Sequence, residues 1–586
     1  MKQFFKFMFA SMLGTFLLFF LVTLISIGII AAIVAAASSD ETIISKNTVL
    51  RMTLSKPVVD RSAKMKVVMG YAGPDNATGL NDILDNLKKA KKDDNIAGIY
   101  LDLSDIPAGI STIEEIRTAL LDFKTSGKFI WAYSEVYSQK SYYLATVADK
   151  IFLNPQGVVD FKGLAVEMTF LKGMLEKLDV KMQVIRHGKF KAATEPLFLD
   201  KMSPENRRQT TKLIADIWER MITGISESRK LGKPELNQVA DSLKLQTASD
   251  ALKYKFVDQL IYKDELIKEM KKKVNVEEKK NVQYINMDSY TSVAEKKKNL
   301  TANDKIAVIY ATGSIGAGEG DDQSIGSERI SKAIRKARED EKVKAIVFRI
   351  NSGGGSALSS DVIWREIDLA RKVKPVVASF GDVAASGGYY IACAATKIIA
   401  SPTTITGSIG VFGLIPNFEG LFTKKLGITF DWAMTNKNGD YIPVMKPLSA
   451  YQSMLIQRDV DNIYDVFTGK VAEGRKLTKA QVDSIGQGRV WSGSDAKTIG
   501  LIDEFGGLTR SIQVAAELAK TKNYKVISLP EQKEWYEKLI DQITGNDPSA
   551  KMKTVLGEDY HYYQYIKDIR EMKGVQTRMV TDFVIN

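Results

Sequence analysis

The stretch from residue 381 to residue 413 reads GDVAASGGYYIACAATKIIASPTTITGSIGVFG, and it holds Ser386 at a turn of small residues. The residues after this turn, Tyr389 to Thr396, have good helix potential, so we expect Ser386 between a strand and a helix. A serine at such a turn exposes its oxygen, and the next backbone N–H, that of Gly387, can bind an oxyanion. On its own, the motif Ala-Ser-Gly-Gly favours a simpler interpretation, a turn in which Ser386 only caps the helix.

A second glycine cluster lies upstream, at residues 351–356 (NSGGGS). It follows Ala345–Ile350, a run of apolar and β-branched residues typical of a buried parallel strand. Ligands bind at the carboxyl ends of such strands, and glycines such as Gly354 and Gly355 let another group approach the backbone closely. A strand-to-helix loop whose glycines only relieve strain explains the cluster equally well, so the cluster alone is weak evidence.

Strand-like and helix-like segments alternate around these motifs. Ile306–Tyr310 and Ala345–Ile350 read as strands, whereas Ile330–Arg338 and Asp361–Lys372 read as helices. This alternation is typical of an α/β fold built from right-handed strand–helix–strand units.

The chain also repeats itself. Tyr142 and Gly163 of the first half match Tyr389 and Gly410 of the second, and both pairs are 247 positions apart (389 − 142 = 410 − 163 = 247). A constant offset across several elements indicates a duplicated domain. Between the matching halves lies a segment rich in Lys, Glu, Asn and Ser, which reads as a linker.

The N-terminus carries an uncharged run from Phe7 to Ser39, and a helix of about 20 apolar residues is enough to cross a bilayer. The alternative is a cleaved signal peptide, but the apolar region of such peptides is only about 7 to 15 residues long. Lysines precede the run and acidic residues follow it, so we expect a single-pass anchor in the inner (cytoplasmic) membrane, with the N-terminus cytoplasmic and the body periplasmic or extracytoplasmic. The expected domains are a cytoplasmic stub and transmembrane anchor (1–44), a first α/β repeat (45–270), a linker (271–304), a second α/β repeat (305–528) and a helical tail (529–586).

Composition excludes several kinds of site. The 586 residues include one cysteine, Cys393, and two histidines, His187 and His561, which argues against an intrachain disulfide, a Cys-rich metal site and a His-based metal site. The net charge of +12 is modest for this length, and no zinc-finger, homeodomain or RNP pattern is present. We therefore expect no cofactor, no metal and no nucleic-acid partner.

Four blocks in order resemble signal peptide peptidase A of the long, two-repeat type, also called protease IV. They are INSGGGSA (350–357), FGDVAASGGYYIA (380–392), TGSIGVFG (406–413) and GRVWSGSDAKTIGLIDEFGG (488–507). The resemblance covers roughly residues 45 to 525 and implies tandem duplicated Clp protease/crotonase-like α/β domains. One departure is Gly353, which stands where the family usually has proline.

The resemblance implies a serine/lysine dyad, with Ser386 as the nucleophile. The family's lysine motif reads GKFKAATEP here (188–196), so Lys191 is the expected general base and the nearby Lys189 the runner-up. A lysine acts as a base only when neutral, so its pKa must fall well below about 10.4, which burial in an apolar cleft achieves. The resemblance also implies that Ser408 accepts a hydrogen bond from the lysine, although a turn residue bonded to local backbone explains Ser408 too. The expected oxyanion hole is formed by the N–H of Gly387 and that of Gly354 or Gly355.

The halves differ in a complementary way. The position that matches Ser386 in the first half holds Gln139 (386 − 247 = 139), and the second half has no equivalent of KAATEP. Each half keeps what the other lacks, so one complete site needs both.

By resemblance, the chain is a membrane-anchored serine endopeptidase and a homotetramer. Its expected partners are the lipid bilayer, other membrane-associated peptides and, as substrates, signal peptides left in the membrane after preprotein processing. A crotonase-like acyl-CoA enzyme shares the fold and oxyanion hole, but the anchor and Ser386 argue against it. A non-catalytic membrane scaffold of the same fold is a third reading, against which Ser386, Lys191 and Ser408 all argue.

Overall fold

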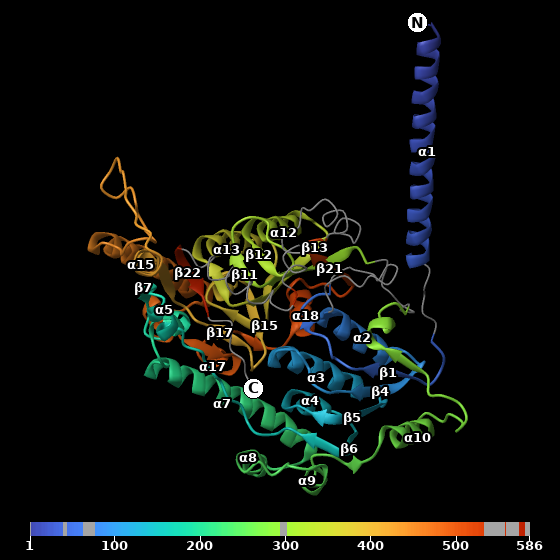
Figure 1. The fold of residues 1–586 in the computed structure, drawn as a ribbon. Helices are drawn as coiled ribbons and strands as arrows, with labels where there is room; N and C mark the ends of the chain where they lie inside the picture. The colour runs from blue at the N-terminus through green and yellow to red at the C-terminus, as the bar shows by residue number, and fades with distance from the viewer. Residues whose placement is uncertain are drawn as a thin grey trace.

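The computed structural model describes residues 2–38, 44–62, 77–293, 302–532, 557 and 574–579. Helix α1 (Lys2–Ser38) stands clear of the body (Figure 1). Large apolar side chains between Phe4 and Ile25 are exposed on this helix. Within the described residues, α1 is the one helix long and apolar enough to cross a membrane.

The first half forms a six-stranded sheet in the order β8-β6-β5-β4-β1-β9, in which every neighbouring pair is parallel. Its strands are β1 (Thr48–Met52), β4 (Ile96–Asp102), β5 (Phe129–Tyr137), β6 (Lys150–Val159), β8 (Gln259–Leu260) and β9 (Tyr284–Asn286). The inner strands are buried along nearly their whole length, which explains their continuous apolar sequences.

The second half forms a similar sheet, except that its edge pair β17–β19 is antiparallel. Its sheet runs β19-β17-β15-β13-β10-β21, and β16 and β20 branch from β15. Its strands are β10 (Asp304–Thr312), β13 (Val343–Ser352), β15 (Val376–Ala385), β16 (Lys397–Ala400), β17 (Ile405–Gly407), β19 (Val490–Ser492), β20 (Glu504–Phe505) and β21 (Tyr524–Leu529).

The helices follow the duplication as well. Helices α2 (Leu80–Lys92) and α12 (Ser327–Glu339) begin and end 247 positions apart, and so do α3 (Ile110–Lys124) and α13 (Ala357–Arg371). The offset found in the sequence therefore holds for whole elements. The other helices are α4 (Gln139–Ala145), α5 (Lys172–Lys177), α6 (Glu195–Phe198), α7 (Pro204–Arg229), α8 (Lys233–Asp241), α9 (Ala248–Lys253), α10 (Lys263–Lys273), α11 (Met287–Tyr290), α14 (Gly387–Tyr390), α15 (Ala450–Arg475), α16 (Lys479–Ile485), α17 (Gly493–Thr498) and α18 (Leu508–Leu518).

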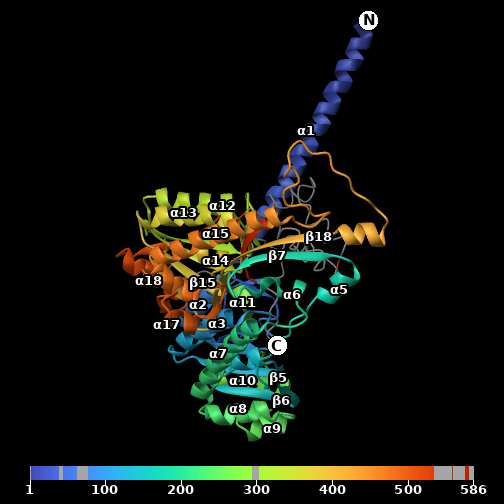
Figure 2. The same ribbon diagram turned by 90° about the vertical axis from the view of Figure 1, so that its left-hand side faces the viewer.

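A third sheet joins the two halves, in the order β12-β11-β14-β22-β18-β7. Strand β7 comes from the first half and pairs antiparallel with β18 of the second, and the two lie side by side in Figure 2. The strands are β7 (Lys181–His187), β11 (Ser314–Gly316), β12 (Ser324–Gly326), β14 (Gly354–Ser356), β18 (Val411–Asn417) and β22 (Gly574–Arg578).

Two expected segments differ from the structure. Residues 284–286 of the expected linker form β9, because they complete the edge of the first sheet beside β1. Residues 574–578 of the expected helical tail form strand β22, since the sequence GVQTR alternates β-branched residues and fits between two open strands. The aromatic run of the tail, at residues 560–563, lies outside the described residues.

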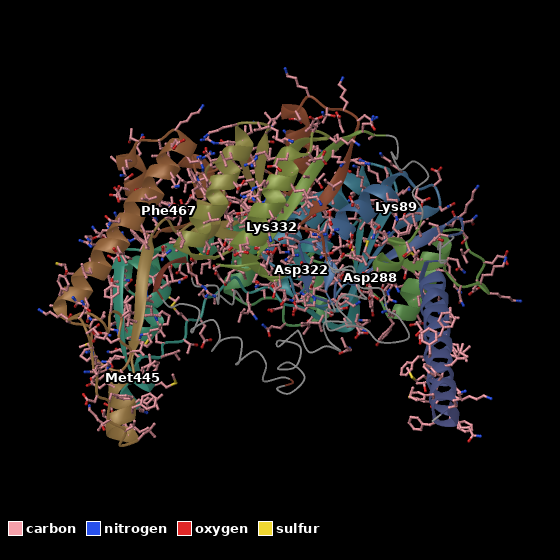
Figure 3. All side chains as sticks on the ribbon, turned by 90° about the horizontal axis from the view of Figure 1, so that it is seen from above. Lys89, Asp288, Asp322, Lys332, Met445 and Phe467 are labelled. Atoms are coloured by element: carbon pink, nitrogen blue, oxygen red, sulfur yellow. The ribbon has the colours of Figure 1, made fainter. Side chains whose placement is uncertain are left out.

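The halves are packed against each other through buried charges. Arg349 of β13 lies between two carboxylates of the first half, 2.7 Å from Asp60 and 2.7 Å from Glu115. Asp382 of β15 accepts hydrogen bonds from the backbone N–H and the hydroxyl of Thr112 at 3.0 and 2.6 Å. These contacts tie the strands that lead to both glycine motifs to the first half. In the view from above, Phe467 on α15 and Lys89 on α2 lie on opposite sides of Lys332 of α12 (Figure 3).

Candidate active site

Ser386 follows the last residue of β15 and precedes α14, so it lies between a strand and a helix as expected. The helix is not the expected Tyr389–Thr396, because α14 ends at Tyr390 and turns follow it. Its backbone has φ 55° and ψ −116°, a strained conformation that costs about 1–3 kcal/mol and is concentrated at functional sites. The backbone N–H donates to the carbonyl oxygen of Gly407 at 2.8 Å, which holds the strained turn. The side chain makes no capping hydrogen bond to α14, so the simpler interpretation of Ser386 as a helix cap is wrong.

Lys191 of the first half reaches this serine. Its side chain is buried, with 1% of the residue exposed, and Nζ lies 2.7 Å from Ser386 Oγ. The same Nζ lies 3.1 Å from both the carbonyl oxygen and the hydroxyl of Ser408. Lys189, the alternative lysine, is exposed. The structure therefore brings together the three side chains that the sequence singled out, from positions 195 and 217 residues apart along the chain.

The surroundings favour a neutral amine. Burial lowers the pKa of Lys191 well below its ordinary value, because the site penalises the charged form. Within the described residues, the atoms at hydrogen-bonding distance from Nζ belong to Ser386 and Ser408, and all of them are uncharged. A neutral amine has two N–H groups and one lone pair. If Ser408 accepts both N–H groups, the lone pair faces the hydroxyl of Ser386.

Loops from both halves enclose the lysine. The N–H of Phe190 donates to the carbonyl oxygen of Gln487 at 2.9 Å. Gly488 has φ 77°, and a Cβ at this position would lie 2.6 Å from Lys191 Cβ. A Cβ at Gly410 would lie 3.2 Å from Lys191 Cδ. Both glycines are therefore required for close packing around the lysine stem, a role that the sequence reasoning missed although Gly488 opens one of the quoted blocks.

Polar residues behind Lys191 fix its loop. Glu195 is fully buried and accepts hydrogen bonds from Ser203 Oγ at 2.6 Å and Asn206 Nδ2 at 2.9 Å. Gln209 bridges the halves, because its Nε2 donates to the carbonyl oxygen of Phe190 and its Oε1 accepts from the N–H of Val490, both at 3.1 Å. Glu195 belongs to the lysine motif, so the sequence indicated that it lies near the site. No motif in the sequence includes Gln209.

The glycine motifs meet beside Ser386. Gly354 has φ 101°, and a Cβ at this position would lie 2.6 Å from the backbone nitrogen of Gly387. Gly387 is the first residue of α14, so its N–H has no partner within that helix. The N–H of Gly354 donates to Ser352 Oγ at 3.1 Å, whereas Gly355 pairs with Ile315 of β11. Of the two glycines considered for the oxyanion hole, Gly354 and Gly355, Gly354 is the one that lies against Gly387.

In the part of the chain that the structure describes, no group of three or more His, Cys, Asp or Glu side chains is placed to hold a metal ion.

Comparison with known proteins identifies the family. The model of peptidase family S49 matches residues 122–277 and 368–522, once in each half. The chain belongs to peptidase family S49. Protease 4 of Salmonella typhi is 38% identical over 476 residues, which are 80% of this chain and 76% of that protein. Serine protease SPPA, chloroplastic, of Arabidopsis thaliana is 34% identical over 550 residues, 92% of this chain and 78% of that protein. Among solved structures, ClpP1 from Listeria monocytogenes is similar over 34% of this chain and 91% of its own, with 17% identity and a TM-score of 0.22.

These findings settle the class of protein. The family predicted from the four blocks is confirmed, and so is the fold class of tandem duplicated α/β domains with an N-terminal apolar helix. The S49 protein is a serine peptidase, and α1 fits a membrane-anchored protein. The matches give no support to the acyl-CoA enzyme or the non-catalytic scaffold.

Proposed function

We propose that this S49 peptidase cleaves peptide bonds with a catalytic dyad of Ser386 and Lys191. The observation that carries the proposal is the 2.7 Å separation of Nζ and Oγ at a buried position where the lysine pKa is lowered. Few serines elsewhere in a protein have a neutral amine within hydrogen-bonding distance, because most lysines are solvated and charged.

The mechanism follows from the contacts. The lone pair of Lys191 accepts the proton of Ser386 Oγ as that oxygen attacks the scissile carbonyl carbon. The N–H groups of Gly387 and Gly354 stabilise the oxyanion, for which Gly354 must share or leave its bond to Ser352. Lys191 then protonates the leaving amine, and a water molecule hydrolyses the acyl-enzyme by the same proton transfers. Ser408 positions the amine throughout.

The substrates that we propose are signal peptides left in the membrane after preprotein processing, together with other membrane-associated peptides. The support is α1, which holds the body next to the bilayer where such peptides lie. The lysines before the apolar run and the acidic residues after it favour a cytoplasmic N-terminus and an extracytoplasmic body at the inner membrane. We further propose a homotetramer, on the family resemblance alone.

A three-variant comparison tests the dyad. Full-length wild type, Ser386→Ala, Lys191→Ala and Lys189→Ala are assayed in detergent micelles on a synthetic signal peptide, beside a polar peptide of equal length. General bases contribute about 10²- to 10⁴-fold, so Lys191→Ala should lose activity by that factor. Lys189→Ala, a matched change two positions away at an exposed lysine, should retain it.

A fluorophosphonate probe should label the wild type but not Ser386→Ala. Equal cleavage by wild type and Lys191→Ala would refute the dyad. Equal rates on the apolar and polar peptides would refute the substrate class while leaving the peptidase intact.

A further inference from the structure

A turn of the second half, residues 486–489, is hydrogen-bonded to both loops that carry the lysine and its positioning serine. The carbonyl oxygen of Gln487 accepts the N–H of Phe190, which directly precedes the lysine of the proposed dyad, at 2.9 Å. On the other side, the carbonyl oxygen of Arg489 accepts the N–H of Ser408 at 2.7 Å. The turn therefore fixes the lysine loop relative to the serine loop.

The hydroxyl of Tyr464, on α15, anchors this turn. Gln487 has φ 54°, in the left-handed region that residues other than glycine seldom adopt, and its N–H donates to Tyr464 Oη at 3.1 Å. The same hydroxyl donates to Asp483 Oδ1 at 2.7 Å. A Cβ at Gly486 would lie 3.1 Å from Tyr464 Oη, so the turn lies directly against the buried tyrosine. Tyr464 thus holds the turn at the residue that bonds to the lysine loop.

The ring of Tyr464 contacts the other end of the lysine loop. His187 is the last residue of β7, four positions before Lys191, and its ring stacks on that of Tyr464 with centroids 3.9 Å apart and 20° between the planes. His187 Nδ1 lies 2.8 Å from Oδ1 of Asp461, which is also on α15. Helix α15 therefore contacts the loop where it begins and, through Gln487, just before the lysine.

A tyrosine that only fills space would not be bonded in this way. Tyr290 is such a case, since its buried hydroxyl donates to Asp93 at 2.9 Å in the first half. The hydroxyl of Tyr464 both donates and accepts, and the N–H that it accepts belongs to the turn beside the lysine loop. Burial and the bond to Asp483 raise the pKa of Tyr464, so the hydroxyl keeps its proton and this arrangement at the pH of the assays below.

We propose that Tyr464 is a positioning residue for the general base, and that it sets the place of Lys191 relative to Ser386 by holding the turn 486–489. This inference rests on the proposed Ser386–Lys191 dyad and extends it to a residue on α15. Proton transfer needs the 2.7 Å contact between Nζ and Oγ, and a misplacement of about 1 Å can cost about 10²-fold in rate.

Kinetics of the full-length protein in detergent test the role of the hydroxyl. Tyr464→Phe removes only that oxygen and leaves the Gln487 N–H without its acceptor, so kcat on an internally quenched peptide should fall about 5- to 150-fold. KM should stay within twofold of wild type. The rise of kcat with pH should move to higher pH, because a looser loop admits water and weakens the burial that lowers the pKa of Lys191. Tyr290→Phe, the same change at a tyrosine of the first half, should keep kcat within twofold.

A double variant shows whether the effect passes through the lysine. In a Lys191→Ala background, Tyr464→Phe should change the residual rate by less than twofold, because no base is left to misplace. A general loss of folded protein would instead lower the rate by the same factor in both backgrounds.

Variants of His187 keep the inference testable if Tyr464→Phe does not fold. His187→Ala removes the stacked ring and should lower kcat about 2- to 10-fold. His187→Phe restores a ring and should return kcat to within twofold of wild type. The side chain of Asp461 is 47% exposed, so it stays solvated in both variants.

The outcomes separate this inference from the proposed function. Unchanged kcat in Tyr464→Phe, an equal loss in Tyr290→Phe, or the same factor of loss in both lysine backgrounds overturns the positioning role and leaves the dyad standing. If Tyr464→Phe does not fold, a wild-type kcat in His187→Ala, or a loss that His187→Phe does not restore, overturns it. A wild type that cleaves no peptide and takes no fluorophosphonate probe overturns the proposed function as well.

Discussion

Replacing Ser408 by alanine tests how the buried amine is oriented. The change removes the hydroxyl that lies 3.1 Å from Lys191 Nζ and leaves the carbonyl oxygen of residue 408 in place. One N–H of a neutral Lys191 is then buried without an acceptor, which costs about 1–3 kcal/mol. If that cost appears in the transition state, where the lone pair must face Ser386, kcat/KM falls by about 5- to 150-fold.

The assay is continuous cleavage of an internally quenched peptide between about pH 6 and pH 10, a range below the ordinary lysine pKa. The wild-type rate should rise with pH through the lowered pKa of Lys191, because the neutral amine is the base. Ser331→Ala is the matched control, since Ser331 is another buried serine whose hydroxyl has no hydrogen-bond partner in the described structure. Ser408→Ala activity within twofold of wild type at every pH would refute the positioning role of Ser408.

Two further predictions concern stability. Because burial lowers the folded-state pKa of Lys191, the wild type loses stability as pH falls from about 10.4 to that lowered pKa, and the loss is constant below it. Lys191→Met has no such loss, so its thermal midpoint should exceed that of wild type by a gap that widens on acidification; a gap independent of pH would contradict a neutral buried amine. Arg349→Met leaves Asp60 and Glu115 buried without a counter-charge and should cost about 3–5 kcal/mol, seen as a lower thermal midpoint. Adding Asp60→Asn and Glu115→Gln should recover most of this loss, and a triple variant no more stable than Arg349→Met would show that packing, not charge, was lost.

The sequence predicted most of the elements around the candidate site, and the structure brings the three singled-out residues Ser386, Lys191 and Ser408 together. Strand and helix identity follow from local apolar patterns, and duplication tests each pattern twice, which is why the 247-residue offset holds at both ends of α2 and α12. The Ser386 turn is equally local, since its small neighbours and the helix after it mark it without any distant contact.

Contacts between distant segments could not be predicted in this way. The pairing of β7 with β18 is made by backbone N–H and C=O groups, which almost every residue has, so no residue type predicts it. Gln209 bridges the halves with an ordinary amide, and Gly488 is one of 42 glycines until its φ and its distance to Lys191 are known. The strand in the expected helical tail was missed for the same reason, because β22 forms by pairing with two distant strands, β14 and β18.

The first half shows why the duplicated protein has a single proposed site. Gln139, at the position that matches Ser386, accepts hydrogen bonds from the N–H groups of Lys162 and Gly163 at 2.8 and 2.9 Å and donates to the carbonyl oxygen of Gly163 at 2.8 Å. Gly163 matches Gly410, so this amide binds the loop that in the second half carries Ser408 and packs on Lys191. The Gln139 amide therefore occupies the position of the nucleophile in the first half. A serine at this position would leave the backbone groups of Lys162 and Gly163 without these hydrogen-bond partners. Lys191 follows β7, the strand that pairs with β18 of the other half, so the contact between the halves is a condition of the proposed chemistry.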